Sequence, residues 1–199
     1  MMRGDSFILR VCGGLVAGHD EACTAPIAFS TRKVGALLSF LALSPQQSAS
    51  REYLASLLWG NGSDKQARQS LRQALASLRK DVRPHEIVEA DAHTVRLKPG
   101  AVWVDALELE ALAASTDFDA LTRAIGLFRG ELLAGVSIKE DLFETWLGQQ
   151  PGKGFGLSKR YIVTAMAGVE LEREALPVFA QGVDDKQSFD CGDRVGAPF

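Results

Sequence analysis

The chain has one concentrated run of basic and amide side chains, Ser63–Lys80, and these residue types suit nucleic-acid recognition. No acidic residue lies between Lys65 and Lys80. Arg and Gln can read guanine and adenine edges, and Lys and Arg neutralise phosphates. We therefore predict double-stranded DNA as the partner, the alternative being the solvated basic face of an ordinary helix. The candidates for base edges are Arg72, Gln69 and Gln73, and the candidates for phosphates are Lys65, Arg68, Arg79 and Lys80.

A single helix must position these side chains. Ser63 and Gln66 have the spacing of a capping box, which predicts where the helix begins. Apolar residues recur on one helical face, at Ala67, Leu71, Ala74, Leu75 and Leu78. At about 100° per residue, the opposite face carries Lys65, Gln69, Arg72, Gln73, Ala76 and Lys80. The small Ala76 would leave room for close approach to a DNA groove.

The surrounding segments predict the order sheet, helix, helix, loop, basic helix and hairpin. Alternation and turn residues indicate short strands at Phe7–Cys12, Leu15–Ala17 and Ile27–Phe29. A leucine stripe predicts a helix from near Ser30 to just before Pro45, and Ser50 caps the next helix. Two β-like runs, Ile87–Val88 and Thr94–Leu97, then form a hairpin. This is the order of an α+β winged helix-turn-helix domain with an added N-terminal sheet.

The residues within these elements resemble a known family. The stretches are TRKVGALLSFLALSP, SREYLASLLW, QARQSLRQALASLRK and VRLKPGAVWVDALELEAL. They resemble the actinomycete antibiotic-regulatory-protein (SARP) type of transcriptional activator, over about residues 6–150. That family joins a winged helix of the OmpR/PhoB class to a helical bacterial transcriptional activator domain. The resemblance implies that helix 65–80 is the recognition helix and that the hairpin around His93 is the wing.

Further contacts follow from this assignment. Arg51 lies in the first turn of its helix, where a guanidinium and free N–H groups favour a phosphate. Thr94 and Arg96 would present the wing to the DNA backbone or minor groove. For Arg96 and Lys98 an ordinary solvated strand position is the alternative. By the resemblance, the loop formed by Trp59, Gly60, Asn61 and Gly62 occupies the place where this class commonly contacts RNA polymerase.

We divide the chain into three parts. Residues 1–100 are the predicted winged helix, and residues 101–150 begin the helical activator domain, whose helix pairs are of tetratricopeptide type. That region would hold a second subunit, as in a homodimer, or another partner; alternatively, it only packs on the winged helix. Residues 151–199 depart from the family, with one predicted helix at 158–176 and a disordered tail. The departure fits a truncated or diverged member, or an end read in a different frame.

Charge is distributed unevenly along the chain. Residues 1–100 hold 13 Lys and Arg against 9 Asp and Glu, a net charge of +4, whereas residues 101–199 hold 9 against 16, a net charge of −7. A basic first half suits a nucleic-acid module. No apolar run approaches the roughly 20 residues of a membrane span. We expect a cytoplasmic protein that associates with the nucleoid when bound to DNA.

Catalytic and metal sites are not expected. The three cysteines, Cys12, Cys23 and Cys191, are odd in number and lack metal-ligand spacing, which fits a reducing cytosol. The three histidines are isolated from other ligands. We therefore predict neither an enzyme nor a cofactor. Two rival functions stay open: a protein-interaction adaptor whose basic helix is covered by residues 101–176, and a regulatory head severed from a larger multidomain signalling protein.

Overall fold

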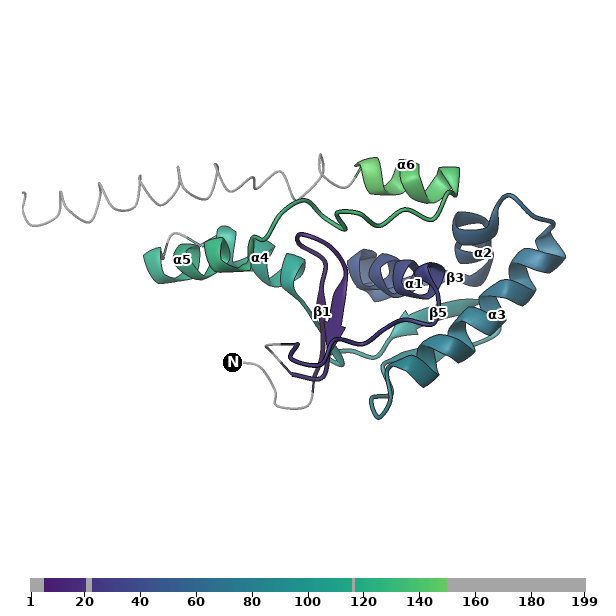
Figure 1. Ribbon diagram of the computed structural model, residues 1–199, viewed down its shortest axis with the longest axis horizontal. Helices are drawn as coiled ribbons and strands as arrows, with labels where there is room; N and C mark the ends of the chain where they lie inside the picture. Colours follow the sequence, from purple (N-terminus) through teal and green to yellow (C-terminus); the bar gives the residue numbers. More distant parts are fainter. Residues whose placement is uncertain (1–5, 21–22, 116, 150–199) are drawn as a thin grey trace, which may run out of the picture.

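The computed structural model describes residues 6–20, 23–115 and 117–149. Two sequence predictions lie outside these residues: the helix at 158–176 and the disordered tail. In chain order the elements are β1 (Phe7–Arg10), β2 (Val16–Gly18), α1 (Arg32–Leu43), a 3₁₀ turn (Pro45–Gln47), β3 (Ser48–Ser50), α2 (Arg51–Trp59), α3 (Asp64–Asp81), β4 (Val88–Ala90), β5 (Thr94–Leu97), β6 (Val102–Val104), α4 (Asp105–Ala113), α5 (Phe118–Leu127) and α6 (Asp141–Gln149). Figure 1 shows their arrangement.

The N-terminal sheet has the strand order β2-β1-β6. β1 pairs antiparallel with β2 and parallel with β6, with Phe7 opposite Val102. The predicted strand Ile27–Phe29 is wrong, because this segment makes no ladder. Its backbone contact is the Ile27 amide, which donates to the Ala17 carbonyl at 2.8 Å, and the preceding Pro26 has no amide to donate.

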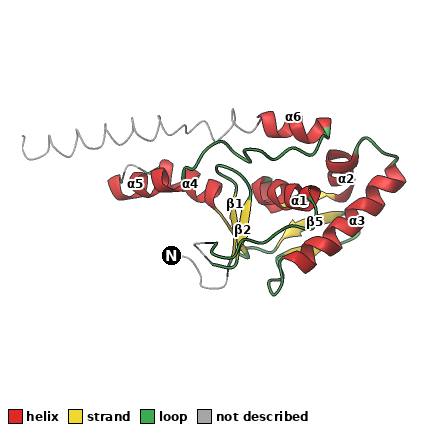
Figure 2. Cartoon of the chain, in the orientation of Figure 1, coloured by secondary structure: helices red, strands yellow, loops and turns green. Residues whose placement is uncertain are grey.

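Three helices and the second sheet form the winged-helix unit. Capping residues set the helix starts: the Thr31 hydroxyl accepts from the Val34 amide before α1, and the Ser50 hydroxyl accepts from the Tyr53 amide before α2. Leucines of all three helices are fully buried together. The second sheet has the order β3-β5-β4, so the predicted hairpin β4–β5 gains a third strand that periodicity did not predict. Figure 2 shows this sheet beside α3.

The helical region begins directly after β6. α4 and α5 pack on each other, whereas α6 packs on α2 of the winged helix. Asp105, the first residue of α4, is 1% exposed, and its carboxylate accepts the Val11 and Cys12 amides at 2.8 and 3.2 Å. These bonds join α4 to the chain that leaves β1. The relationship to tetratricopeptide repeats stays a prediction.

The described helices are too short or too polar to cross a membrane. Cys12 and Cys23 are buried free thiols. Burial, together with the nearby Asp105 carboxylate, raises the pKa of Cys12 to about 12, so this thiol stays protonated and unreactive at neutral pH.

Candidate nucleic-acid interface

Helix α3 carries most of the candidate interface, and local chemistry sets where it begins. The Ser63 amide donates to Gln66 Oε1 at 3.3 Å, and the Gln66 amide donates to Ser63 Oγ at 3.4 Å. The predicted capping box is therefore present. The apolar face is buried as the periodicity predicted, at Ala67, Leu71, Ala74, Leu75 and Leu78.

A contact between distant residues fixes the other end of α3. The Asp81 carboxylate accepts from the Ser30 amide at 2.8 Å and from the Ser30 hydroxyl at 2.6 Å. This pair joins the last turn of α3 to the residue before the N-cap of α1. Local sequence patterns did not predict this contact, because Ser30 and Asp81 are 51 residues apart in the sequence.

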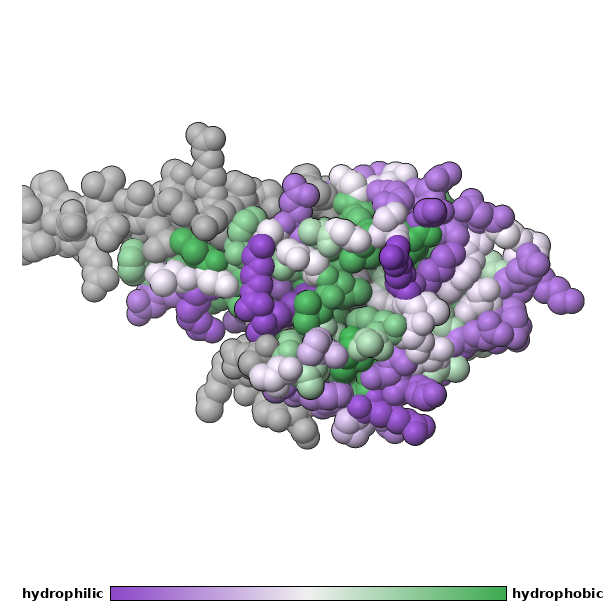
Figure 3. Space-filling model, viewed as in Figure 1, coloured by the Kyte–Doolittle hydropathy of each residue, from purple (hydrophilic) through white to green (hydrophobic). Residues whose placement is uncertain are grey.

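The outward face of α3 is exposed and its charges have no internal partner. All of the predicted contact residues of this helix are exposed: Lys65, Arg68, Gln69, Arg72, Gln73, Arg79 and Lys80. Within the described part of the chain, none of these cations forms an ion pair or a side-chain hydrogen bond. Figure 3 shows hydrophilic residues over the part of the surface that α3 occupies, while hydrophobic residues gather nearer β1 and α1. The helix therefore presents uncompensated positive charge to solvent.

A groove of about 800 Å³ runs along one side of α3, between the helix, the start of α2 and the wing. Arg51, Lys65, Arg68, Arg72 and His93 contribute to its lining. Arg51 joins two of its walls, because its amide donates to the His93 carbonyl at 2.8 Å and its Nη1 donates to the Asp91 carbonyl at 3.3 Å. Arg51 is thus half-buried and placed between α2 and the wing.

The wing hairpin turns around one carboxylate. Asp91 Oδ1 accepts the amides of His93 and Thr94, each at 2.7 Å, and these bonds lower the pKa of Asp91. Thr94 is half-buried beside this turn. Arg96 pairs with Glu89 across the hairpin at 2.7 Å, so its charge already has a partner. Lys98 likewise pairs with Glu86, at 3.0 Å. Because both cations are already paired, they are less available to bind DNA than the cations of α3, which are unpaired among the described residues.

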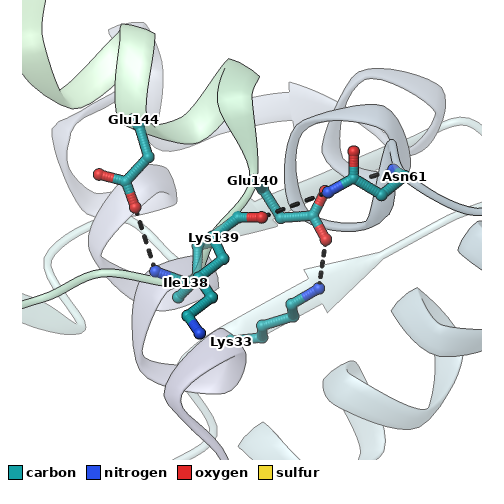
Figure 4. A network of polar contacts seen from close by, with 6 residues as sticks. All are labelled: Lys33, Asn61, Ile138, Lys139, Glu140 and Glu144. Atoms are coloured by element: carbon teal, nitrogen blue, oxygen red, sulfur yellow. Dashed lines mark hydrogen bonds and ion pairs between the residues drawn. The ribbon is translucent and has the colours of Figure 1, made fainter.

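The loop Trp59–Gly62 contacts a segment far away in the sequence, residues 137–140, which we call the strap. Glu140 is 6% exposed, and its Oε1 accepts from Lys33 Nζ at 2.6 Å. Its Oε2 accepts from the Asn61 amide at 3.4 Å, while Asn61 Nδ2 donates to the Lys139 carbonyl at 3.2 Å (Figure 4). The Lys33 ammonium also lies 5.5 Å from the centre of the Trp59 ring. The strap therefore holds the turn between α2 and α3, leaving Gly60 and Gly62 exposed.

The described histidines and acidic residues outside this interface do not form a second candidate site. His19 and His85 stack with ring centres 5.0 Å apart, which their separation in sequence did not indicate. Among the described residues, no group of three or more His, Cys, Asp or Glu could hold a metal ion.

A comparison with protein families finds a match over the same elements. The family described as "Transcriptional regulatory protein, C terminal" matches residues 27–98, which span α1, α2, α3 and the wing hairpin. Residues 27–98 therefore resemble the domain that this family describes. The assignment agrees with the OmpR/PhoB-class winged helix expected from the sequence.

A solved structure extends the likeness of fold beyond this domain. The structure of Mycobacterium tuberculosis EmbR in complex with a low-affinity phosphopeptide superposes with a TM-score of 0.63 at 21% sequence identity. The match covers 88% of this chain and 48% of that chain, so the present chain spans about half the length of EmbR in that structure. No curated protein sequence matches the chain.

Proposed function

We propose that the chain is a sequence-specific DNA-binding transcriptional regulator that acts as an activator. The observation that carries the proposal is the outward face of α3, whose cations and amides are exposed and lack internal partners. The match of residues 27–98 to a transcriptional-regulator domain supports the same reading. In this proposal α3 enters the major groove, and the wing hairpin lies along the adjacent backbone or minor groove.

The side chains would divide between two roles. Arg72, Gln69 and Gln73 would contact base edges, where Arg pairs with guanine and Gln with adenine. The other cations would bind phosphates, which position the domain without specifying sequence. This second group consists of Arg51, Lys65, Arg68, Arg79 and Lys80, with Thr94 and Arg96 from the wing. Arg96 would first have to release Glu89, which makes it the weakest candidate.

Activation would require a contact with RNA polymerase, and the loop Trp59–Gly62 is our candidate for it. Gly60 and Gly62 are exposed, whereas Asn61 is engaged by the strap through both its backbone and its side chain. The polymerase would therefore meet the glycines and the edge of the half-buried Trp59. The helical region would hold a second copy of the chain in a homodimer.

The rival function is a protein-interaction adaptor. It would be favoured if residues 101–176, which are acidic overall, covered the basic face of α3. Among the described residues from 101 to 149, the strap lines a groove along α3, and the cations of α3 are still exposed. This exposure favours DNA as the partner.

Selection of bound duplexes from a random DNA pool, at two salt concentrations, tests the proposal. Specific readout predicts an enriched motif that survives the higher salt, with affinity of about 10⁻⁸ to 10⁻¹¹ M. The spacing of repeats in that motif would report the geometry of the oligomer. Binding without enrichment that disappears at higher salt would mean that α3 contacts only phosphates. No binding at either salt would favour the adaptor.

A further inference from the structure

A second groove, of about 590 Å³, lies on the side of α3 away from the wing. Its walls are the start of α1, the flank of α3 that carries Ser70 and Ser77, and the strap. Arg32 and Lys139 line it, and within the described residues neither forms an ion pair. Lys33 also lines it, but Glu140 compensates its charge. The groove thus has two uncompensated cations.

The two grooves lie on opposite flanks of α3. At about 100° per residue, Arg68 and Arg72 point to the wing side, Ser70 and Ser77 point to the strap side, and Gln69 lies between them. A helix in the major groove has a sugar–phosphate backbone on each side, because the groove is bounded by both strands. Cations on only one flank would hold one backbone, whereas this chain has cations on both.

The position of Lys139 is set by contacts on both sides of it. Its backbone adopts the left-handed region, with φ of 57°, which a side chain other than glycine rarely adopts without support. The support is its carbonyl bond to Asn61, the buried Glu140 that follows it, and the Ile138 amide, which donates to Glu144 at 3.2 Å. Figure 4 shows the Lys139 side chain extending away from Asn61. The polar network thus anchors the backbone of a lysine whose side chain is left exposed.

We propose that Lys139 and Arg32 bind phosphates of the DNA strand that borders α3 on the side opposite the wing. The DNA interface then includes a residue beyond the domain at 27–98, so the strap both holds the turn before α3 and contributes to binding. Arg32 can bind a phosphate through two parallel N–H donors, and Lys139 provides a point charge. This inference rests on the proposed DNA-binding function.

The test compares variants of the full chain on one selected duplex, with Kd measured over a series of salt concentrations. Lys139→Asn removes the charge with a residue that tolerates the left-handed backbone. It should lower the slope of log Kd against log salt by about 0.9, the value for one phosphate contact. Lys139→Arg should keep the slope of the unaltered chain. Arg123→Asn, which removes an exposed cation of α5, is the matched control and should leave the slope unchanged.

Ethylation of individual phosphates locates the contact. With the unaltered chain, modification of a phosphate on the strand away from the wing should interfere with binding, and Lys139→Asn should abolish that interference. Equal slopes for Lys139→Asn and the unaltered chain would overturn the inference. Binding of an acidic peptide in the groove beside the strap, in place of DNA, would overturn it as well. Loss of binding in both Lys139→Asn and Lys139→Arg would assign the residue a structural role instead. Failure of the unaltered chain to bind any duplex would overturn the proposed function itself.

Discussion

The two buried carboxylates, Asp105 and Glu140, have partners among the described residues, whereas the cations on the outward face of α3 do not. Asp105 and Glu140 are nearly inaccessible, and each accepts two hydrogen bonds from partners far away in the sequence. The cations of α3 are exposed and have no such partners in the described part of the chain. Burying a charge is costly unless it is paired, whereas an exposed charge can be kept for an external ligand. Changes to the first set should therefore affect stability, and changes to the second set should affect DNA binding.

Asp105→Ala should give the largest effect. It leaves the Val11 and Cys12 amides without an acceptor, at a cost of about 1–3 kcal/mol for each. Chemical denaturation would measure the change in the free energy of unfolding. Glu110→Ala, an exposed site on the same helix, is the control and should change it by less than about 0.5 kcal/mol. Equal effects of the two changes would show that the buried carboxylate does not join β1 to α4.

The effect of Asp105→Ala should also depend on pH. Burial raises the pKa of Asp105 above its ordinary value of 3.8, so the folded chain retains this proton to higher pH than the unfolded chain. The stability that this group contributes is fully present below 3.8 and is lost as the pH rises through the raised pKa. Denaturation at several pH values should show a smaller difference between the two chains near neutrality than in acid. A difference that grows with pH would contradict the direction of the shift.

Glu140→Ala should come next. It removes the partner of Lys33 and the acceptor of the Asn61 amide, and about 3 kcal/mol of stability should be lost. The value lies at the lower end for a broken pair because the Lys33 side chain is 27% exposed and regains some hydration. Asp141→Ala changes the adjacent exposed acid and is the matched control. If both variants unfold alike, the strap does not hold the turn before α3.

Arg72→Ala should weaken DNA binding by about 1–3 kcal/mol and relax sequence preference at one base pair, with stability unchanged. Affinity for the selected duplex and for its single-base variants measures both effects, with Arg123→Ala as the control for lost charge. Equal weakening on every duplex would make Arg72 a phosphate contact. If Arg72→Ala lowered stability instead, changes on α3 and changes to the buried carboxylates would have the same kind of effect, contrary to our expectation.

Lys80→Ala should have the smallest effect. It should weaken binding to all sequences alike and lower the salt slope by about one unit, because one phosphate contact is lost. Titrations at several salt concentrations measure the slope. An unchanged slope would place Lys80 outside the interface, and the interface would then be limited to the earlier turns of α3.

By itself, the sequence determined the local structure of α3 and the identity of its exposed side chains. Capping, helical periodicity and the absence of acids act within a few residues, so Ser63, Leu71 and Arg72 could be placed without any tertiary information. The helix starts predicted near Ser30 and at Ser50, and the wing hairpin, followed from similarly local signals. The contact roles assigned to these residues stay predictions.

Only the tertiary structure decided which distant segments surround that helix. β6 pairs with β1 although nearly the whole winged-helix sequence lies between them. Asp81 accepts hydrogen bonds from Ser30, which is 51 residues away in the sequence. Glu140 reaches Lys33 across 107 residues, and this contact places Lys139 beside α3. No periodicity encodes such pairs, because each depends on how packed elements bring two short segments together. Local patterns therefore define the surface that α3 presents, and long-range packing defines what lies on either side of it.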